Sequence, residues 1–393
     1  MKKILVILGL VLILLGGILL ATFPQMTSFF KETVYIAVVG PMSGPYKHEG
    51  ASMLQGISLY LEQAREKGEL GDKRIVLLIE DDQDDAQVAE KAAAKIAQEN
   101  KALIVLGHSY SGPSIAAGKI YRKYEIPAIT ASATADNVTL GNEWYFRVIP
   151  ANWFQAKFLT NYIKSTLKKD ALSIIAVDNE YGDSLAKGIT AAATELGINI
   201  VKEWKMAEQP TPDDVEQIAA EISARDDPGV LVLATNGTAA DAKLLALLRD
   251  RGKIYTLIGD DSFGDEAFAK YFADYPKEQA NPGYYSDGLY AVSPFMPAIA
   301  DKEAFDFRQA FEKTYQSLPE SWYIACYYDA MHVAVEAMKR AQLQGQGHIR
   351  SDRQKVRTAL VNFYSLDTGL KGVTGYIYFN QDRDVTRPFA VGQ

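Results

Sequence analysis

Short runs of β-branched and apolar residues alternate with longer segments of helical period from about Thr33 to Ile258. The runs cover residues 34–39, 75–80, 102–106, 128–130, 172–177, 198–204, 230–234 and 255–258. The segments between them predict helices over 50–67, 87–99, 113–124, 152–167, 182–196, 213–224 and 239–251. Strand–helix–strand units of this kind form parallel sheets with helices on both faces. The sequence therefore predicts an α/β fold.

The length and the spacing of the runs indicate two similar lobes. The chain has 393 residues, and four of the runs precede Pro150 while four follow it. A chain of this length usually forms two domains. We expect two doubly wound parallel-sheet lobes. After Gly288 the pattern is less regular, with helices expected over 304–316, 322–342 and 354–363 and a strand over 375–379.

Charge and cysteine content exclude several classes of protein. The chain carries 41 basic and 49 acidic residues, a formal charge of −8, which is opposite in sign to a nucleic-acid binder. Its one cysteine, Cys326, excludes an internal disulfide, a thiolate zinc site, a CxxC redox pair and a lipid-modified cysteine near the N-terminus. Phosphate-loop, dinucleotide and HExxH motifs are absent from the sequence, so we expect no cofactor.

The N-terminal segment 1–33 predicts export. Lys2 and Lys3 precede Ile4 to Ala21, an 18-residue run of Leu, Ile, Val, Gly and Ala only. This run is long enough to span a membrane and long for the core of a signal peptide. No clean cleavage site follows it, so an uncleaved membrane anchor and a removed signal both remain open. In either case, the residues after Phe23 are expected to cross the membrane, which gives a periplasmic or extracytoplasmic location.

Polar loops follow several strands at the edge where ligands of open α/β sheets bind. The loop after Leu106 leads into a predicted helix, whose free amides would favour an anion, with help from the hydroxyls of Ser109 and Ser111. Alternatively, Ser111 caps its own helix. The loop from Thr130 to Ala135 offers three hydroxyls and close approach to the main chain, although it could also be packing filler.

A pair of carboxylates, Asp260 and Asp261, follows the last strand of the alternating series. Two acids at a strand end suit a cation. Solvated surface or a helix cap is the commoner role for such a pair. If Asp260 faces solvent, we expect it to contribute much less to binding than Asp261.

Motifs for catalysis and for metal binding are weak. Residues 107–111 resemble a nucleophile elbow, but the last position should be glycine and is Ser111. The four histidines are scattered along the chain. The acidic run 80–85 lacks the glycine and distal glutamate of an EF-hand loop, and it is better explained as a cap of the next helix. We therefore predict no enzyme and no metal site.

Several segments together resemble a known family. Residues 36–45, the loop 107–111, residues 129–134 and Tyr181–Gly182 look like the type I periplasmic binding proteins, in particular the leucine/isoleucine/valine-binding branch of amino-acid ABC transport. The resemblance extends from Val34 to about Val391. It implies two lobes, joined by three crossings, that close on a ligand in the cleft between them. On this basis the first lobe is assigned to 34–150 and 288–350, and the second to 151–287 and 351–393.

The resemblance also implies roles for individual residues. Ser111 and Thr134 are expected to bind the carboxylate of the ligand. A main-chain carbonyl near Ser132 and the side chain of Asp261 are expected to bind the ammonium, and Tyr181 is expected to close the cleft from the second lobe. The sequence departs from the family's pattern at two places that bear on recognition of the ligand's side chain. No aromatic residue is present around residues 236–238, and the first loop carries His48–Glu49, with Tyr46 nearby, where the family often has an aromatic residue.

Three functions follow as alternatives. The leading one is an exported solute-binding protein, tethered to the membrane by its N-terminal segment, that captures a branched-chain-like amino acid or a similar small polar metabolite and delivers it to an ABC permease. The second is a ligand-sensing ectodomain that acts through a separate signalling partner. The third, which is remote, is an exported serine hydrolase using Ser109 or Ser111.

Overall fold

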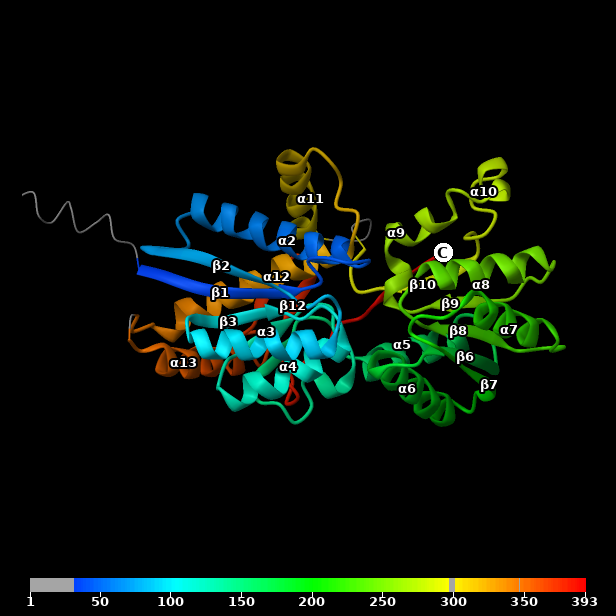
Figure 1. Ribbon diagram of the computed structural model, residues 1–393, viewed down its shortest axis with the longest axis horizontal. Coiled ribbons are helices and arrows are strands. Elements are labelled where there is room, and N and C mark those ends of the chain that lie inside the picture. The colour runs from blue at the N-terminus through cyan, green and yellow to red at the C-terminus, as the bar shows by residue number, and fades with distance from the viewer. Residues whose placement is uncertain (1–31, 297–300, 346) are drawn as a thin grey trace, which may run out of the picture.

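The computed structural model describes residues 32–296, 301–345 and 347–393, which form two α/β lobes lying side by side (Figure 1). The predicted anchor or signal, Ile4 to Ala21, lies outside the described residues. Among the residues that are described, the structure contains no helix with the length and apolar character needed to cross a bilayer.

The first lobe is built on a five-stranded sheet in the order β2-β1-β3-β4-β5, with parallel pairing throughout. The chain enters at β1, places β2 on one side of it and β3, β4 and β5 on the other, and so confirms the doubly wound prediction. Its strands are β1 (Glu32–Gly40), β2 (Lys73–Asp81), β3 (Ala102–Gly107), β4 (Ala128–Thr130) and β5 (Tyr145–Arg147). Its first helices are α2 (Lys47–Glu66), α3 (Ala86–Glu99) and α4 (Ser111–Lys123).

The second lobe has a six-stranded sheet in the order β13-β10-β9-β8-β6-β7, parallel except for the last strand of the chain. Its strands are β6 (Ala171–Val177), β7 (Asn199–Met206), β8 (Val230–Ala234), β9 (Leu257–Gly259), β10 (Leu289–Ser293) and β13 (Ala390–Gly392). Its main helices are α5 (Asn152–Ser165), α6 (Glu180–Leu196), α7 (Pro212–Ser223) and α8 (Ala239–Asp250). The short η2 (Asp261–Gly264) and α9 (Glu266–Ala269) follow β9.

Each strand contributes alternate side chains to two cores, as expected of a sheet that is covered on both faces. In β1, Ile36 and Val38 pack with α2 and α12 (Trp322–Ala341), whereas Ala37 and Val39 pack with α3 and α4. The helices α2 and α12 approach closely at Gly56. A Cβ atom at this position would lie 2.1 Å from the carbonyl oxygen of Ile324, so a larger residue would separate the two helices.

Local signals explain several element boundaries. Asp85 caps α3 by accepting hydrogen bonds from the amides of Gln87 at 2.7 Å and Val88 at 2.9 Å. The interpretation of the acidic run as a helix cap is thereby confirmed for this residue. Asn179 caps α6 in the same way, through the amides of Tyr181 and Gly182.

The C-terminal third crosses between the lobes in a way that differs from the predicted boundaries. β10, inside the range 288–350 given to the first lobe, pairs with β9 in the second sheet. Helix α13 (Ile349–Val361) packs on α12 and β3 of the first lobe, and the hairpin of β11 (Leu370–Gly372) and β12 (Gly375–Ile377) lies against α12. Only the end of the chain, drawn in red, passes to the second lobe, where β13 pairs with β10 (Figure 1).

Candidate ligand-binding cleft

A cavity lies between the two lobes. Its empty space, including the part that is open to solvent, is about 720 Å³. Most of its walls come from segments that follow β1, β3, β4, β6, β8 and β9, that is, from the carboxyl ends of parallel strands in both sheets, and the start of α12 supplies the rest. This is the edge at which open α/β sheets bind ligands. The structure brings all of the predicted site residues to this cavity: Ser111, Ser132, Thr134, Tyr181 and Asp261.

The N-terminus of α4 forms one end of the site. No side chain of the described residues caps this helix, and Pro113 in its first turn carries no amide hydrogen. The hydroxyl oxygen of Ser111 accepts a hydrogen bond from the amide of Ala135 at 3.1 Å, so the interpretation of Ser111 as a cap of its own helix is wrong. Because the hydroxyl still has a proton to donate, Ser111 and the uncapped amides of α4 together suit a carboxylate.

Ser132 connects the loops that follow β3 and β4. Its hydroxyl donates to the main-chain carbonyl of Ser109 at 2.7 Å and lies 3.1 Å from the phenol oxygen of Tyr327. On the other side of the same loop, the guanidinium of Arg147 donates to the carbonyl oxygens of Ala133 at 3.2 Å and Ala135 at 2.7 Å. These bonds hold the main chain around Thr134 in place beside α4.

Asp261 lines the site from the second lobe. Its side chain is almost fully buried, and its Oδ1 accepts a hydrogen bond from the Tyr181 hydroxyl at 2.8 Å. Its main-chain carbonyl accepts another from the indole of Trp322 at 3.1 Å. Burial raises the pKa of the Asp261 carboxyl, because the ionised form has lost its water. A ligand ammonium placed here would restore the stability of the carboxylate.

From the sequence, Asp260 was expected to contribute little to binding if it faced solvent. In the structure it is fully buried, so this condition is not met. Its Oδ1 accepts from the amide of Ser262 at 3.0 Å and so caps η2, while Oδ2 has no hydrogen-bond partner in the described structure. Burial, followed by the negative charge of Asp261, raises the pKa of Asp260 well above its ordinary value. The interpretation of this pair as solvated surface is therefore wrong, and the interpretation of Asp260 as a cap is confirmed.

Sequence reasoning did not identify Gln155 of α5. This side chain is fully buried close to Asp261, and neither its amide nitrogen nor its amide oxygen has a hydrogen-bond partner among the described residues. Gln155 lies in the first turns of a helix and follows no strand, so the rule that selects strand ends could not find it.

Aromatic rings and two further acids line the rest of the cavity. They come from both lobes and include Tyr46, Glu49, Tyr110, Asp265, Phe268 and Tyr271. Residues 236–238 also line it and carry no aromatic ring, as the sequence indicated, but Phe268 and Tyr271 supply rings from a neighbouring segment of the same lobe. That segment consists of the short helices α9 and η3 (Lys270–Phe272), and no motif in the sequence pointed to it.

The arrangement does not support a hydrolase. The ring nitrogens of His108 lie 2.7 Å from Asp82 and 2.9 Å from the Tyr121 hydroxyl, so the imidazole is engaged within the first lobe. The Ser109 hydroxyl donates to the sulfur of Met53 at 2.8 Å. Neither candidate serine is hydrogen bonded to a histidine in the described part of the chain. Within that part, no group of three or more potential ligand residues is arranged to hold a metal ion.

Comparison with known proteins agrees with this geometry. The family model described as periplasmic binding protein matches residues 33–393. The Leu/Ile/Val/Thr-binding protein of Salmonella typhimurium is 28% identical over 189 residues, which are 48% of this chain and 51% of that protein. The match thus spans about half the length of this relative.

Solved structures share the fold. The branched-chain amino acid transporter substrate-binding protein LivJ from Streptococcus pneumoniae, in complex with isoleucine, has a TM-score of 0.76 at 21% identity, over 92% of this chain and 95% of that chain. A solute-binding protein of an ABC transporter from R. palustris, in complex with benzoate, has a TM-score of 0.73 at 20% identity, over 91% and 92%. The predicted fold class and the family resemblance are confirmed. Since the family model covers nearly every described residue, the chain belongs to the periplasmic binding protein family.

Proposed function

We propose that the chain is the substrate-binding component of an ABC transporter and that it binds a free α-amino acid between its lobes. The ligand carboxylate would lie at the N-terminus of α4 with Ser111 and Thr134. The ligand ammonium would lie at Asp261, whose carboxylate is oriented by Tyr181. The relative from Salmonella typhimurium, named for binding Leu, Ile, Val and Thr, supports this class of ligand.

The single observation that carries the proposal is that the buried carboxylate of Asp261 and the uncapped end of α4 line the same cavity. The R. palustris protein is in complex with benzoate, an anion without an amino group, so the fold alone does not require an ammonium. A buried carboxylate does favour one, because a ligand lacking the ammonium would leave Asp261 without a counter-charge.

Contacts between the lobes support closure around the ligand. The Trp322–Asp261 hydrogen bond joins α12 of the first lobe to η2 of the second. The amide of Asp136 donates to the Ser184 hydroxyl at 3.1 Å, which joins the first lobe to α6. A ligand that touches both lobes stabilises the closed arrangement over an open one, and we infer that this arrangement is the form presented to the permease.

Calorimetry on matched ligands and variants tests the proposal. Each α-amino acid is compared with the corresponding 2-oxo acid, which keeps the carboxylate and loses the ammonium. We expect the amino acid to bind and the 2-oxo acid to bind poorly. Asp261→Asn should weaken amino-acid binding by about 2 to 5 kcal/mol, the usual range for a broken buried charge pair. Asp178→Asn, at an exposed aspartate after β6, is the control and should bind as the parent does. Equal binding of both ligand types would overturn the proposal.

We also propose that the segment Ile4 to Ala21 tethers the protein to the membrane. Its support is the unbroken apolar run and the absence of a clean cleavage signal after it. N-terminal sequencing of the native protein tests this point. A mature chain that begins between Thr22 and Lys31 would show that the segment is removed.

A further inference from the structure

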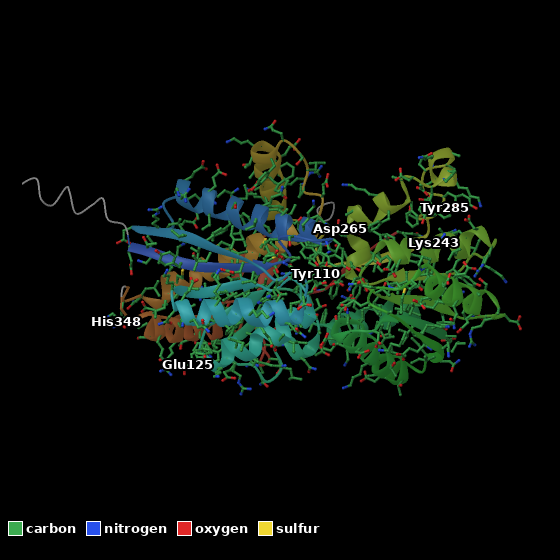
Figure 2. The ribbon with its side chains drawn as sticks, viewed as in Figure 1. Tyr110, Glu125, Lys243, Asp265, Tyr285 and His348 are labelled. Carbon is green, nitrogen blue, oxygen red and sulfur yellow. The ribbon has the colours of Figure 1, made fainter. Side chains whose placement is uncertain are left out.

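Besides the residues that suit an α-amino-acid frame, the cavity is lined by a group that we name the acidic-aromatic subsite. It consists of Tyr46, Glu49, Tyr110, Asp265, Tyr271 and Tyr323. Figure 2 shows Tyr110 and Asp265 at the junction of the two lobes. The ligand's side chain would lie in this part, so its chemistry bears on which amino acid is bound.

Glu49 supplies a partly buried carboxylate, one oxygen of which has no hydrogen-bond partner among the described residues. It lies in the first turn of α2, and its side chain is 14% exposed. Oε1 accepts a hydrogen bond from the Tyr110 hydroxyl at 3.0 Å and lies 3.0 Å from Nε2 of His48. Oε2 is buried and has no hydrogen-bond partner among the described residues. A buried acceptor without a partner is costly, and a ligand N–H group would satisfy it.

Asp265 brings a second carboxylate from the other lobe. It precedes α9, and its Oδ1 accepts from the amide of Ala267 at 2.9 Å. Burial raises the pKa of the Asp265 carboxyl, and the negative charge of Glu49 contributes to this shift across the cleft. A positive charge between the two carboxylates would relieve both the repulsion and the lost hydration.

The rings around these acids also suit a cation. Tyr46 and Tyr110 lie with their centroids 5.2 Å apart, and Tyr271 and Tyr323 line the same subsite. Ring faces attract ammonium and guanidinium groups. Burial raises the pKa of Tyr46 to about 12, and nearby carboxylates, first Asp84 and then Glu208, add to that shift. Two further carboxyl groups, those of Asp84 and Glu208, therefore lie close to Tyr46.

The protein itself supplies little compensation for this charge. Of the residues that the structure describes, no lysine or arginine lines the cavity, and His48 is the one basic side chain that does. His48 can offset part of the charge, because its contact with Glu49 raises its pKa and it also acts on Asp265. An apolar branched side chain could pack against the rings, but it would leave Oε2 of Glu49 unpaired and His48 as the one cation facing two carboxylates.

We propose that the preferred ligand carries a second cationic group, so that it is a diamino acid or a guanidino amino acid and not an apolar branched-chain amino acid. This inference rests on the proposed amino-acid frame. The distal ammonium or guanidinium lies between Glu49 and Asp265 among the tyrosine rings, while the α-ammonium lies at Asp261.

Calorimetry with ligands that differ in one group tests the inference. Lysine, ornithine and arginine are compared with leucine and with norleucine, which matches lysine without its distal nitrogen. Cadaverine matches lysine without its carboxylate. We expect one of the basic amino acids to bind at least tenfold more tightly than norleucine. Glu49→Gln, which keeps an acceptor for Tyr110, should reduce that preference at least tenfold, as should Asp265→Asn. The control, Glu62→Gln, changes an exposed residue of the same helix and should leave the preference unchanged.

Each outcome separates this inference from the proposed function. If leucine or norleucine binds as tightly as lysine, ornithine and arginine, the requirement for a distal cationic group on the ligand is rejected, and the proposed binding of an α-amino acid is retained. If cadaverine binds more tightly than lysine, the subsite does bind a cationic group, but the proposed binding of the ligand's carboxylate is rejected. If no α-amino acid binds to protein whose thermal unfolding shows a folded state, both fail. A preference that survives in both Glu49→Gln and Asp265→Asn would overturn the assigned subsite.

Discussion

The indole nitrogen of Trp322 donates a hydrogen bond across the cleft to the main-chain carbonyl of Asp261, at 3.1 Å. Trp322 is the first residue of α12 in the first lobe, and Asp261 is the first residue of η2 in the second. This bond therefore exists only when the lobes lie against each other. Its acceptor belongs to the same residue whose side chain is expected to hold the ligand ammonium, so closure and binding are linked.

Trp322→Phe tests this link. The substitution keeps an aromatic ring but removes the N–H donor, so the arrangement with the lobes together loses about 0.5 to 1.5 kcal/mol. Ligand affinity should fall by a similar amount, because the ligand must now supply more of the free energy of closure. Calorimetry measures the affinity, and small-angle scattering measures compaction on ligand addition. Trp153→Phe, at a more exposed tryptophan of α5, is the control. Unchanged affinity in Trp322→Phe would contradict the link.

Asp260→Asn should make the ligand-free protein more stable at neutral pH. Asp260 has a raised pKa in the folded protein, whereas in the unfolded chain its pKa is about 4. At a pH between these two pKa values, Asp260 is protonated in the folded protein and ionised in the unfolded chain. The free energy of unfolding is therefore highest below the pKa of the unfolded chain, and it falls as the pH rises through the pKa of the folded protein. Each unit of difference is worth about 1.4 kcal/mol.

Urea unfolding of the parent and of Asp260→Asn across this pH range checks the prediction. The asparagine oxygen can still accept from the amide of Ser262, so the η2 cap is kept. The variant should show a weaker fall in stability with rising pH, and its midpoint should exceed that of the parent at the upper end of the range. Parallel pH profiles would show that Asp260 does not ionise with the raised pKa.

Much of the fold could be predicted because the signals are local. Each expected strand before residue 260 was found, since β-branched runs and helical periods are written in neighbouring residues. The strands that were missed depend on distant partners. β5 has three residues and includes the buried Arg147, which would be an unusual strand residue without Asp384 beside it. The pairing of β10 with β9 and β13 likewise cannot be seen in its own five residues.

The residues of the candidate site also divide into those that local sequence patterns predict and those that depend on distant contacts. Ser111, Ser132, Thr134, Tyr181 and Asp261 all follow strands, so the geometry of parallel sheets gathers them at one edge. Gln155 lies near Asp261 in the first turn of α5, and Asp265 and Tyr271 line the cavity from the short helices that follow β9. Their contribution depends on the packing of the whole molecule, which local patterns do not describe.

The buried pair of Arg147 and Asp384 should contribute strongly to stability and to the site. Arg147 Nη2 lies 2.8 Å from Asp384 Oδ1, and its guanidinium also holds the carbonyls of Ala133 and Ala135. Removing one partner leaves the other charge buried, so Arg147→Met should cost about 3 to 5 kcal/mol of stability. Because the loop around Thr134 loses its support, ligand affinity should fall as well.

An exposed ion pair of the same lobe is the matched control. Arg122 lies 3.1 Å from Glu143, and both side chains are exposed to solvent. Arg122→Met should cost less than about 1 kcal/mol, the upper range for exposed pairs. Thermal and urea unfolding measure both variants. If the two substitutions cost the same, the buried pair does not have the structural role inferred from its contacts.

Ser111→Ala should weaken the ligand in a way that depends on the ligand's carboxylate. The hydroxyl can donate to a charged oxygen while it accepts from the amide of Ala135, and a hydrogen bond to a charged group is worth about 1.5 to 3 kcal/mol. Calorimetry on the tightest-binding amino acid and on its carboxamide separates this donor role from a general loosening of the loop. We expect affinity for the acid to fall by about tenfold or more, since 1.4 kcal/mol is one factor of ten. The carboxamide, which has no charged oxygen, should lose less.

Ser111→Thr keeps the hydroxyl and should restore part of the affinity for the acid. Equal losses for the acid and the carboxamide would show that Ser111 supports the loop and does not bind the carboxylate.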